Sequence, residues 1–245
     1  LVWLGLGQRL IGYDPSARHL LAPAAGTTLY HSPPPWVPGP GAGHPAERTN
    51  STMYRVLVIG CGGSGAKTLA YMMDQLRADL KVYGIKEIPG CWQFLNVDTP
   101  LQEELPTSVA PVSRQGGHYV SCGVSSGAYR IVDEALVEDV QAQTPTGLRD
   151  LATWLPRRPQ DVTVPLNIGA GQYRGIGRLV ILTKLAEIQD AVRQAVEAMG
   201  HPDSLRAAEE VARRVPGVGT APVIDMAPMV LVVSSMAGGS GASMT

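Results

Sequence analysis

The sequence has few cysteines and almost no excess charge of either sign. Its three cysteines, Cys61, Cys91 and Cys122, form no CxxC pair, so neither a disulfide framework nor a zinc site is expected. Scattered cysteines suit a reducing compartment, and we expect the protein in the cytoplasm. Because 20 lysines and arginines face 21 aspartates and glutamates, the net charge of −1 excludes a strong electrostatic hold on nucleic acid.

Long apolar runs are also missing. No run approaches the roughly 18–20 residues that span a bilayer, so we expect no membrane span. The apolar opening, residues 1–7, is broken by glycine and lacks positive charge, and we do not expect a signal peptide there. With 245 residues, 44% of them hydrophobic, the chain is long enough for one large domain with its own core.

Proline and glycine are abundant instead, at 20 and 28 residues. Residues 1–52 include the run PPPWVPGPG and show no lasting helical or strand period, which predicts a disordered extension. At Met53 the character of the sequence changes, and residues 53–245 are expected to form the folded domain. The interpretation we favour is that Met53 is the natural start of the protein; the alternative is a proline-rich docking tail.

The folded part opens with a strand, a glycine-rich turn and a helix. Val56–Ile59 is an apolar run typical of a buried parallel strand, and Ala66–Leu80 has apolar residues at helical spacing. Glycines let the backbone approach a ligand closely, and the free N–H groups of a first helical turn attract anions. The pattern predicts a phosphate site, and the alternative is a turn that only packs strand on helix. The residues of this site are Gly60, Cys61, Gly62, Gly63, Ser64 and Gly65.

Two common nucleotide-binding motifs fit this turn less well. A P-loop requires GxxxxGK[ST], but Ala66 separates Gly65 from Lys67, which moves the lysine about 100° around the helix. A Rossmann dinucleotide fold requires an acidic residue about 20 positions further on, at the end of the second strand. Glu87 is at a possible distance, but the residues around it lead into a Pro-Gly turn.

Polar residues end the predicted second strand, Trp92–Val97. Asn96 and Asp98 lie there on the ligand side of an open parallel sheet, unless they only cap a turn or a helix. Further along, Tyr129–Gln141 predicts a helix, and the glycine-rich piece Gln115–Gly127 has no assignment.

Two more apolar segments each lead into a glycine loop. Val162–Ile168 predicts the third strand, and a long amphipathic helix follows over Arg178–Met199. Met229–Ser234 predicts the fourth strand. The loops after these strands supply further candidate phosphate ligands, which are Gly169, Ala170, Gly171, Gly238, Gly239, Ser240 and Gly241.

The order of these elements predicts an α/β fold, a Rossmann-like open parallel sheet with helices on both faces. If the first and fourth strands are neighbours, in the order 3-2-1-4, their loops flank the crevice where such sheets bind ligands. Three glycine loops would then hold phosphates from several sides.

Four motifs, in this order, resemble the glycine loops of the tubulin/FtsZ superfamily, and most closely its bacterial tubulin-like branch. They are GCGGSGAK, FLNVDT, IGAGQYRGIGR and SSMAGGSGAS. The resemblance covers about residues 53–245 and implies GTP binding with Mg²⁺ and head-to-tail self-association. It implies that Asn96 and Asp98 lie near the Mg²⁺ or its waters, and that residues 169–171 report on the γ-phosphate.

The resemblance also has departures from the family pattern. Lys67, counted here among the nucleotide-binding residues, stands where FtsZ has an asparagine that touches guanine. In the family, the acidic loop that activates water in the neighbouring subunit comes after the fourth motif. The resemblance therefore implies the N-terminal part of a GTPase domain, with no catalytic residue of its own and the fourth strand left as an exposed edge.

Two hypotheses of other classes stay open. One is a Rossmann-type enzyme that binds NAD, FAD or ATP through Gly60, Gly62 and Gly65, which leaves the two later glycine loops unexplained. The other is a scaffold whose loops no longer bind a nucleotide.

Overall fold

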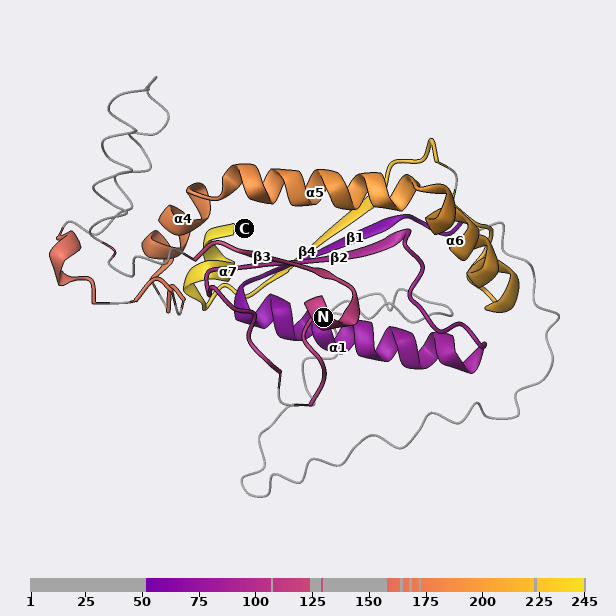
Figure 1. The fold of residues 1–245 in the computed structure, drawn as a ribbon, viewed down its shortest axis with the longest axis horizontal. Helices are drawn as coiled ribbons and strands as arrows, with labels where there is room; N and C mark the ends of the chain where they lie inside the picture. Colours follow the sequence, from indigo (N-terminus) through magenta and orange to yellow (C-terminus); the bar gives the residue numbers. More distant parts are fainter. Residues whose placement is uncertain are drawn as a thin grey trace, which may run out of the picture.

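A four-stranded parallel sheet, in the order β3-β2-β1-β4, organises the chain (Figure 1). The predicted extension lies outside the described residues, except for Thr52, which forms a β-bridge with Thr220. This computed structural model describes residues 52–106, 108–123, 129, 158–163, 165–167, 169–171, 173–222 and 224–244.

The two central strands and one edge strand agree with the sequence prediction. β1 (Val56–Cys61) lies between β2 (Trp92–Asp98) and β4 (Met229–Ser234). β1 and β2 each extend past the predicted ends, so that Cys61 and Asp98 close their strands at the same edge of the sheet. β1 and β4 are neighbours in the sheet, which confirms the predicted pairing of the first and fourth strands.

The third strand is a correction. The prediction for Val162–Ile168 was wrong, because the described residues in that segment form loop and turn, with Pro165 lacking a backbone donor. β3 is instead His118–Ser121, inside the piece that had no assignment, and it pairs with Leu95–Asp98 of β2. Leu166 is still buried at 1% exposure, since it packs into the core without strand pairing.

The predicted long helix is two helices. α4 (Arg174–Leu182) ends and α5 (Leu185–Gly200) begins around Thr183, whose hydroxyl donates to the carbonyl of Val180 at 2.7 Å. Such a back-bond competes with the helical pattern and favours a break. Of the predicted helix Tyr129–Gln141, only Tyr129 lies within the described residues, and it is buried.

Helices cover both faces of the sheet, which confirms the predicted fold class. α1 (Gly62–Val82) lies on one face and α5 on the other (Figure 1). Alternate strand residues divide accordingly: Val58 and Phe94 pack with α1, whereas Leu57 and Leu95 pack with α4 and α5. The other elements of the described residues are α6 (Pro202–Arg214), α7 (Gly239–Met244) and the 3₁₀ turns Ser113–Gln115 and Pro159–Asp161.

One edge of the sheet exposes apolar side chains. On β4, Val230 and Val232 are 50% and 55% exposed, while Leu231 and Val233 pack toward α1. The prediction that this strand is an exposed edge agrees with its position in the described sheet. In the described part of the chain, no helix has an apolar stretch long enough to cross a membrane.

Candidate functional site

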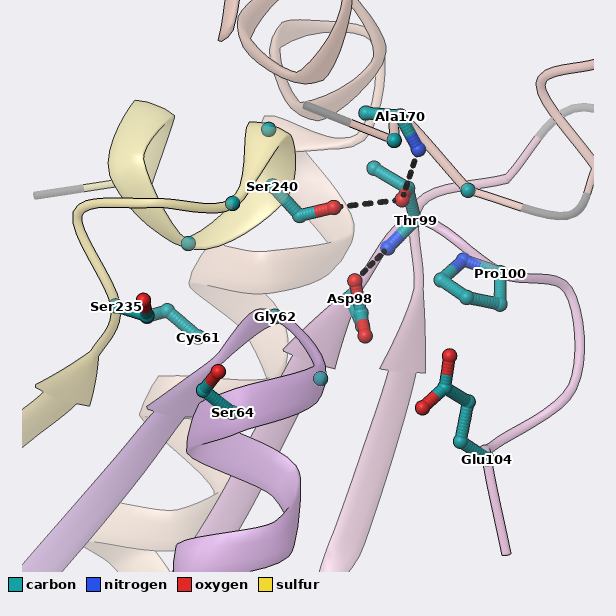
Figure 2. Close-up of a pocket in the computed structure, with 16 residues that line it drawn as sticks. Cys61, Gly62, Ser64, Asp98, Thr99, Pro100, Glu104, Ala170, Ser235 and Ser240 are labelled. Atoms are coloured by element: carbon teal, nitrogen blue, oxygen red, sulfur yellow. Dashed lines mark hydrogen bonds between the residues drawn. The ribbon is translucent and has the colours of Figure 1, made fainter. Parts of the chain in front are cut away.

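A pocket of about 210 Å³ lies at the carboxyl ends of β1, β2 and β4. Residues from four segments meet around it, although the segments are far apart in the chain (Figure 2). None of the described residues in its lining carries a positive charge. The lining consists of Cys61, Gly62, Gly63, Ser64, Asp98, Thr99, Pro100, Glu104, Gly169, Ala170, Gly171, Ser235, Gly238, Gly239, Ser240 and Gly241.

The sequence predicted most of this lining. Among the predicted site residues, only Gly60, Gly65, Lys67 and Asn96 do not line the pocket. Sequence reasoning missed four residues of the lining, namely Thr99, Pro100, Glu104 and Ser235. Thr99 and Pro100 directly follow Asp98 and could have been included with it. Glu104 carried no signal, because its place depends on the path of the loop after β2.

Two of the predicted glycines pack helix on strand instead of facing a ligand. A β carbon on Gly65 would lie 2.6 Å from the carbonyl oxygen of Val233, and one on Gly60 would lie 2.9 Å from the backbone of Gly65. No larger residue fits at these distances. Gly60 and Gly65 therefore serve the packing of helix on strand, which was the alternative interpretation of this turn.

The first turn of α1 faces the pocket with its N–H groups uncapped. The helix begins at Gly62, four residues earlier than predicted, so the glycine turn is itself the first helical turn. Cys61 at the N-cap makes no side-chain hydrogen bond to that turn, and no acidic residue follows in it. Gly62 has φ of +73°, and a β carbon there would meet Gly241 N at 2.7 Å. The N–H groups of a first helical turn that no side chain caps suit a phosphate oxygen.

Thr99 joins three of the four segments around the pocket, which lie within residues 98–104, 169–171 and 235–241. Its hydroxyl accepts from the N–H of Ala170 at 3.0 Å and shares a 2.7 Å hydrogen bond with the Ser240 hydroxyl (Figure 2). The N–H of Gly239 donates to the carbonyl of Gly171 at 2.8 Å. These bonds between distant segments set the spacing of the glycine backbones around the pocket.

Asp98 is the buried charge of the site, with 5% of its surface exposed. Burial raises the pKa of its carboxyl above the ordinary value, and the charge of Glu104 adds to this, while hydrogen bonds from the Thr99 N–H and the Ser240 hydroxyl lower it. The thiol of Cys61 has a pKa raised to about 11, first by burial and then by the charge of Asp98. Cys61 is therefore protonated at neutral pH and unsuited to nucleophilic chemistry.

Glu104 reaches the pocket from the loop after β2. A β carbon placed on Gly63 would lie 3.4 Å from Glu104 Oε2 and 3.9 Å from Asp98 Oδ2, so both carboxylates face one point above the first loop. Lys67 Nζ lies 3.6 Å from the same Glu104 oxygen, with more than half of its side chain exposed. The pocket therefore combines neutral backbone donors with two carboxylates.

Asn96 contacts the loop after β2 and does not line the pocket. Its side-chain amide donates to Glu103 Oε1 at 3.1 Å, and Glu103 in turn accepts from the N–H groups of Val112 and Ser113. Asn96 is fully buried, and its Oδ1 has no hydrogen-bond partner among the described residues. The pair Asn96–Glu103 thus anchors the loop that carries the neighbouring Glu104.

The model of the family described as tubulin-like matches residues 57–245. The chain belongs to the tubulin-like family. The match begins in β1 and includes all four segments around the pocket. A comparison with curated proteins gives no match.

Tubulin-like proteins in general bind GTP with Mg²⁺, and the residues of this pocket fit such a ligand. Glycines from three segments line the pocket, and a β carbon on Gly63 would come within 3.4 Å of Glu104 Oε2. The carboxylates of Asp98 and Glu104 are hard oxygen ligands of the kind Mg²⁺ takes. Among the described residues, no three His, Cys, Asp or Glu side chains are grouped as metal ligands. Mg²⁺ here would therefore rely on phosphate oxygens and water as well as on protein.

Proposed function

We propose that this tubulin-like chain binds GTP as its Mg²⁺ complex in the pocket between the four loops. The proposal rests on one observation: the uncapped first turn of α1, the glycine loops and Asp98 converge on a single pocket. Backbone N–H groups would hold the phosphate oxygens. Asp98 and Glu104 would hold the Mg²⁺ through its waters or directly, and the bound Mg²⁺ supplies neutralisation of phosphate charge.

We further propose that the protein is a bacterial tubulin-like GTPase. The resemblance of the four motifs supports head-to-tail self-association and hydrolysis at a contact between subunits. We therefore assign binding, and no catalytic step, to the residues of this pocket. The buried, free thiols of all three cysteines support a place in the reducing cytoplasm.

Titration calorimetry on the 245-residue chain tests the binding proposal. GTP, ATP and NAD are titrated in turn with Mg²⁺ present, and thermal unfolding is followed under the same conditions. We expect binding of GTP and a higher melting temperature, since a ligand at 100 times its Kd adds about 2.7 kcal/mol to stability. Preference for ATP or NAD would instead support a Rossmann-type enzyme, and a cooperative melt with no ligand effect would support a scaffold.

A matched pair of variants locates the site. Gly63→Val places a side chain where Glu104 and Asp98 face the first loop, and it should abolish binding while the fold persists. Gly200→Ala is the control, because its added β carbon makes only ordinary contacts outside the pocket. Equal GTP affinity of both variants would contradict the placement of the phosphates.

A further inference from the structure

Lys67 does not line the pocket, yet it pairs with a residue that does. Its ammonium lies 3.6 Å from Glu104 Oε2. The same oxygen lies 3.4 Å from the point that a β carbon on Gly63 would occupy, inside the pocket. Glu104 Oε2 therefore lies close both to the ammonium of Lys67 and to the first turn of α1 at Gly63, which lines the pocket.

The carboxylates of the pocket would repel the negative charge of a polyphosphate. Asp98 and Glu104 contribute two carboxylates, and no described lining residue is basic. A polyphosphate entering alone would meet like charge at short range, which is unfavourable in a partly buried site. A divalent cation removes that repulsion because it binds carboxylate and phosphate oxygens together.

We propose that Lys67 is the counter-ion of Glu104 in the ligand-free site, and that the divalent cation carried by the bound polyphosphate takes its place. The inference rests on the proposed nucleotide function. Lys67 is suited to leave, because its side chain is 56% exposed and that of Glu104 is 51% exposed, and an exposed ion pair is weak. Its flexible stem allows the ammonium to move into solvent without any change in α1.

Exchange of this kind has a measurable consequence. If Lys67 competes with the cation for Glu104, its removal lowers the Mg²⁺ concentration needed for nucleotide binding. If Lys67 instead binds phosphate directly, its removal weakens binding even when Mg²⁺ is saturating. A role as competing counter-ion therefore affects the Mg²⁺ midpoint, whereas a role as phosphate ligand affects the GTP affinity at saturating Mg²⁺.

The test measures the Mg²⁺ midpoint for GTP binding to the 245-residue chain at a fixed GTP concentration. We expect Lys67→Met to lower this midpoint by about two- to fivefold, the range that an exposed ion pair allows. Glu104→Gln should raise the midpoint, and in the Glu104→Gln background Lys67→Met should have no effect. Lys67→Arg, which keeps the charge, should behave more like the unmodified protein. Lys81→Met, on an exposed lysine in the last turn of the same helix, is the control.

Three results would overturn the inference. They are an unchanged midpoint in Lys67→Met, a higher midpoint, or weaker GTP binding at saturating Mg²⁺. An unmodified chain that binds no GTP at any Mg²⁺ concentration would overturn the proposed function and this inference together. Binding with an unchanged midpoint would overturn this inference alone.

Discussion

Thr99 and Ser240 are 141 positions apart in the chain, and their hydroxyl oxygens lie 2.7 Å apart in the lining of the pocket. Both residues are buried. Thr99 directly follows β2 and Ser240 lies in the first turn of α7, so this bond joins two segments that are far apart in the chain. The Ala170 N–H adds the third loop to the same oxygen. One buried hydroxyl thus joins three of the four segments that line the pocket.

Replacing Thr99 by valine tests this dependence. Valine has nearly the same shape but no hydroxyl, so the buried Ala170 N–H and the Ser240 hydroxyl each lose a partner. We expect Thr99→Val to lower the free energy of unfolding by about 1–3 kcal/mol, the cost of leaving a buried polar group unpaired. Urea unfolding measures this change. Thr99→Ser, which keeps the hydroxyl, is the control and should retain most of the stability; a loss as large as that of the valine variant would show that the methyl group matters instead.

Glycine at position 65 is required by packing, and glycine at 238 is not. Gly65→Ala places a β carbon 2.6 Å from a backbone oxygen of β4, which should destabilise the chain by about 1–3 kcal/mol as an overpacked site does. This loss outweighs the gain of about 1 kcal/mol that alanine normally brings within a helix. Gly238→Ala has nothing within 4 Å of the added carbon and should unfold like the unmodified chain. Comparison of the two melting curves is the measurement, and a Gly65→Ala variant of full stability would mean that α1 can move away from β4.

The ionised carboxylate of Asp98 costs stability in the ligand-free protein. Its folded-state pKa is raised above the ordinary value of 3.8, chiefly by burial, so the folded state binds a proton more tightly than the unfolded chain. The cost is present in full above the raised pKa and disappears as the pH falls through it toward 3.8. We therefore expect Asp98→Asn to be more stable than the unmodified protein at pH 7, and the difference to vanish in acid. Thermal unfolding as a function of pH measures both effects.

Asp98→Asn should also weaken the proposed Mg²⁺-dependent binding of GTP. Asparagine keeps an oxygen that can accept from the Thr99 N–H but removes the charge that we assign to the Mg²⁺ complex. A variant that gained stability and kept its Mg²⁺-dependent GTP affinity would contradict that assignment.

The cysteines should be unreactive in the folded protein. Burial raises the pKa of Cys61 to about 11 and the pKa values of Cys91 and Cys122 to about 12, so at pH 8 only about one Cys61 in a thousand is a thiolate. We expect Ellman's reagent to label the native chain slowly and to label three thiols after unfolding in guanidinium chloride. Rapid labelling of one native thiol would show that its surroundings open in solution.

The predictable part of the fold consists of segments with a signal of their own. β1 and β4 are mostly apolar runs, β2 is an apolar segment that ends in polar residues, and the glycine-rich turn at Gly62 follows β1 directly. Neighbours in the sequence were therefore enough to identify these strands. β3 lacked such a signal, because it has only four residues and begins with the exposed His118. The apolar residues of Val162–Ile168 suggested a strand, but burial of Leu166 needs only the core and no partner strand.

The candidate site divides in the same way. Glycine, serine and aspartate after apolar strands have a local physical reason, since parallel strands end at one edge of a sheet, and the sequence by itself determined that these residues would gather there. Only the tertiary structure decided which glycines line the pocket, because Gly60 and Gly65 lie against backbone of the sheet and α1, whereas Gly63 lies opposite the carboxylates of Glu104 and Asp98. Only the tertiary structure brought Glu104 beside Asp98 and Lys67, because the path of the loop is set by Asn96 and Glu103 through contacts that no local pattern encodes.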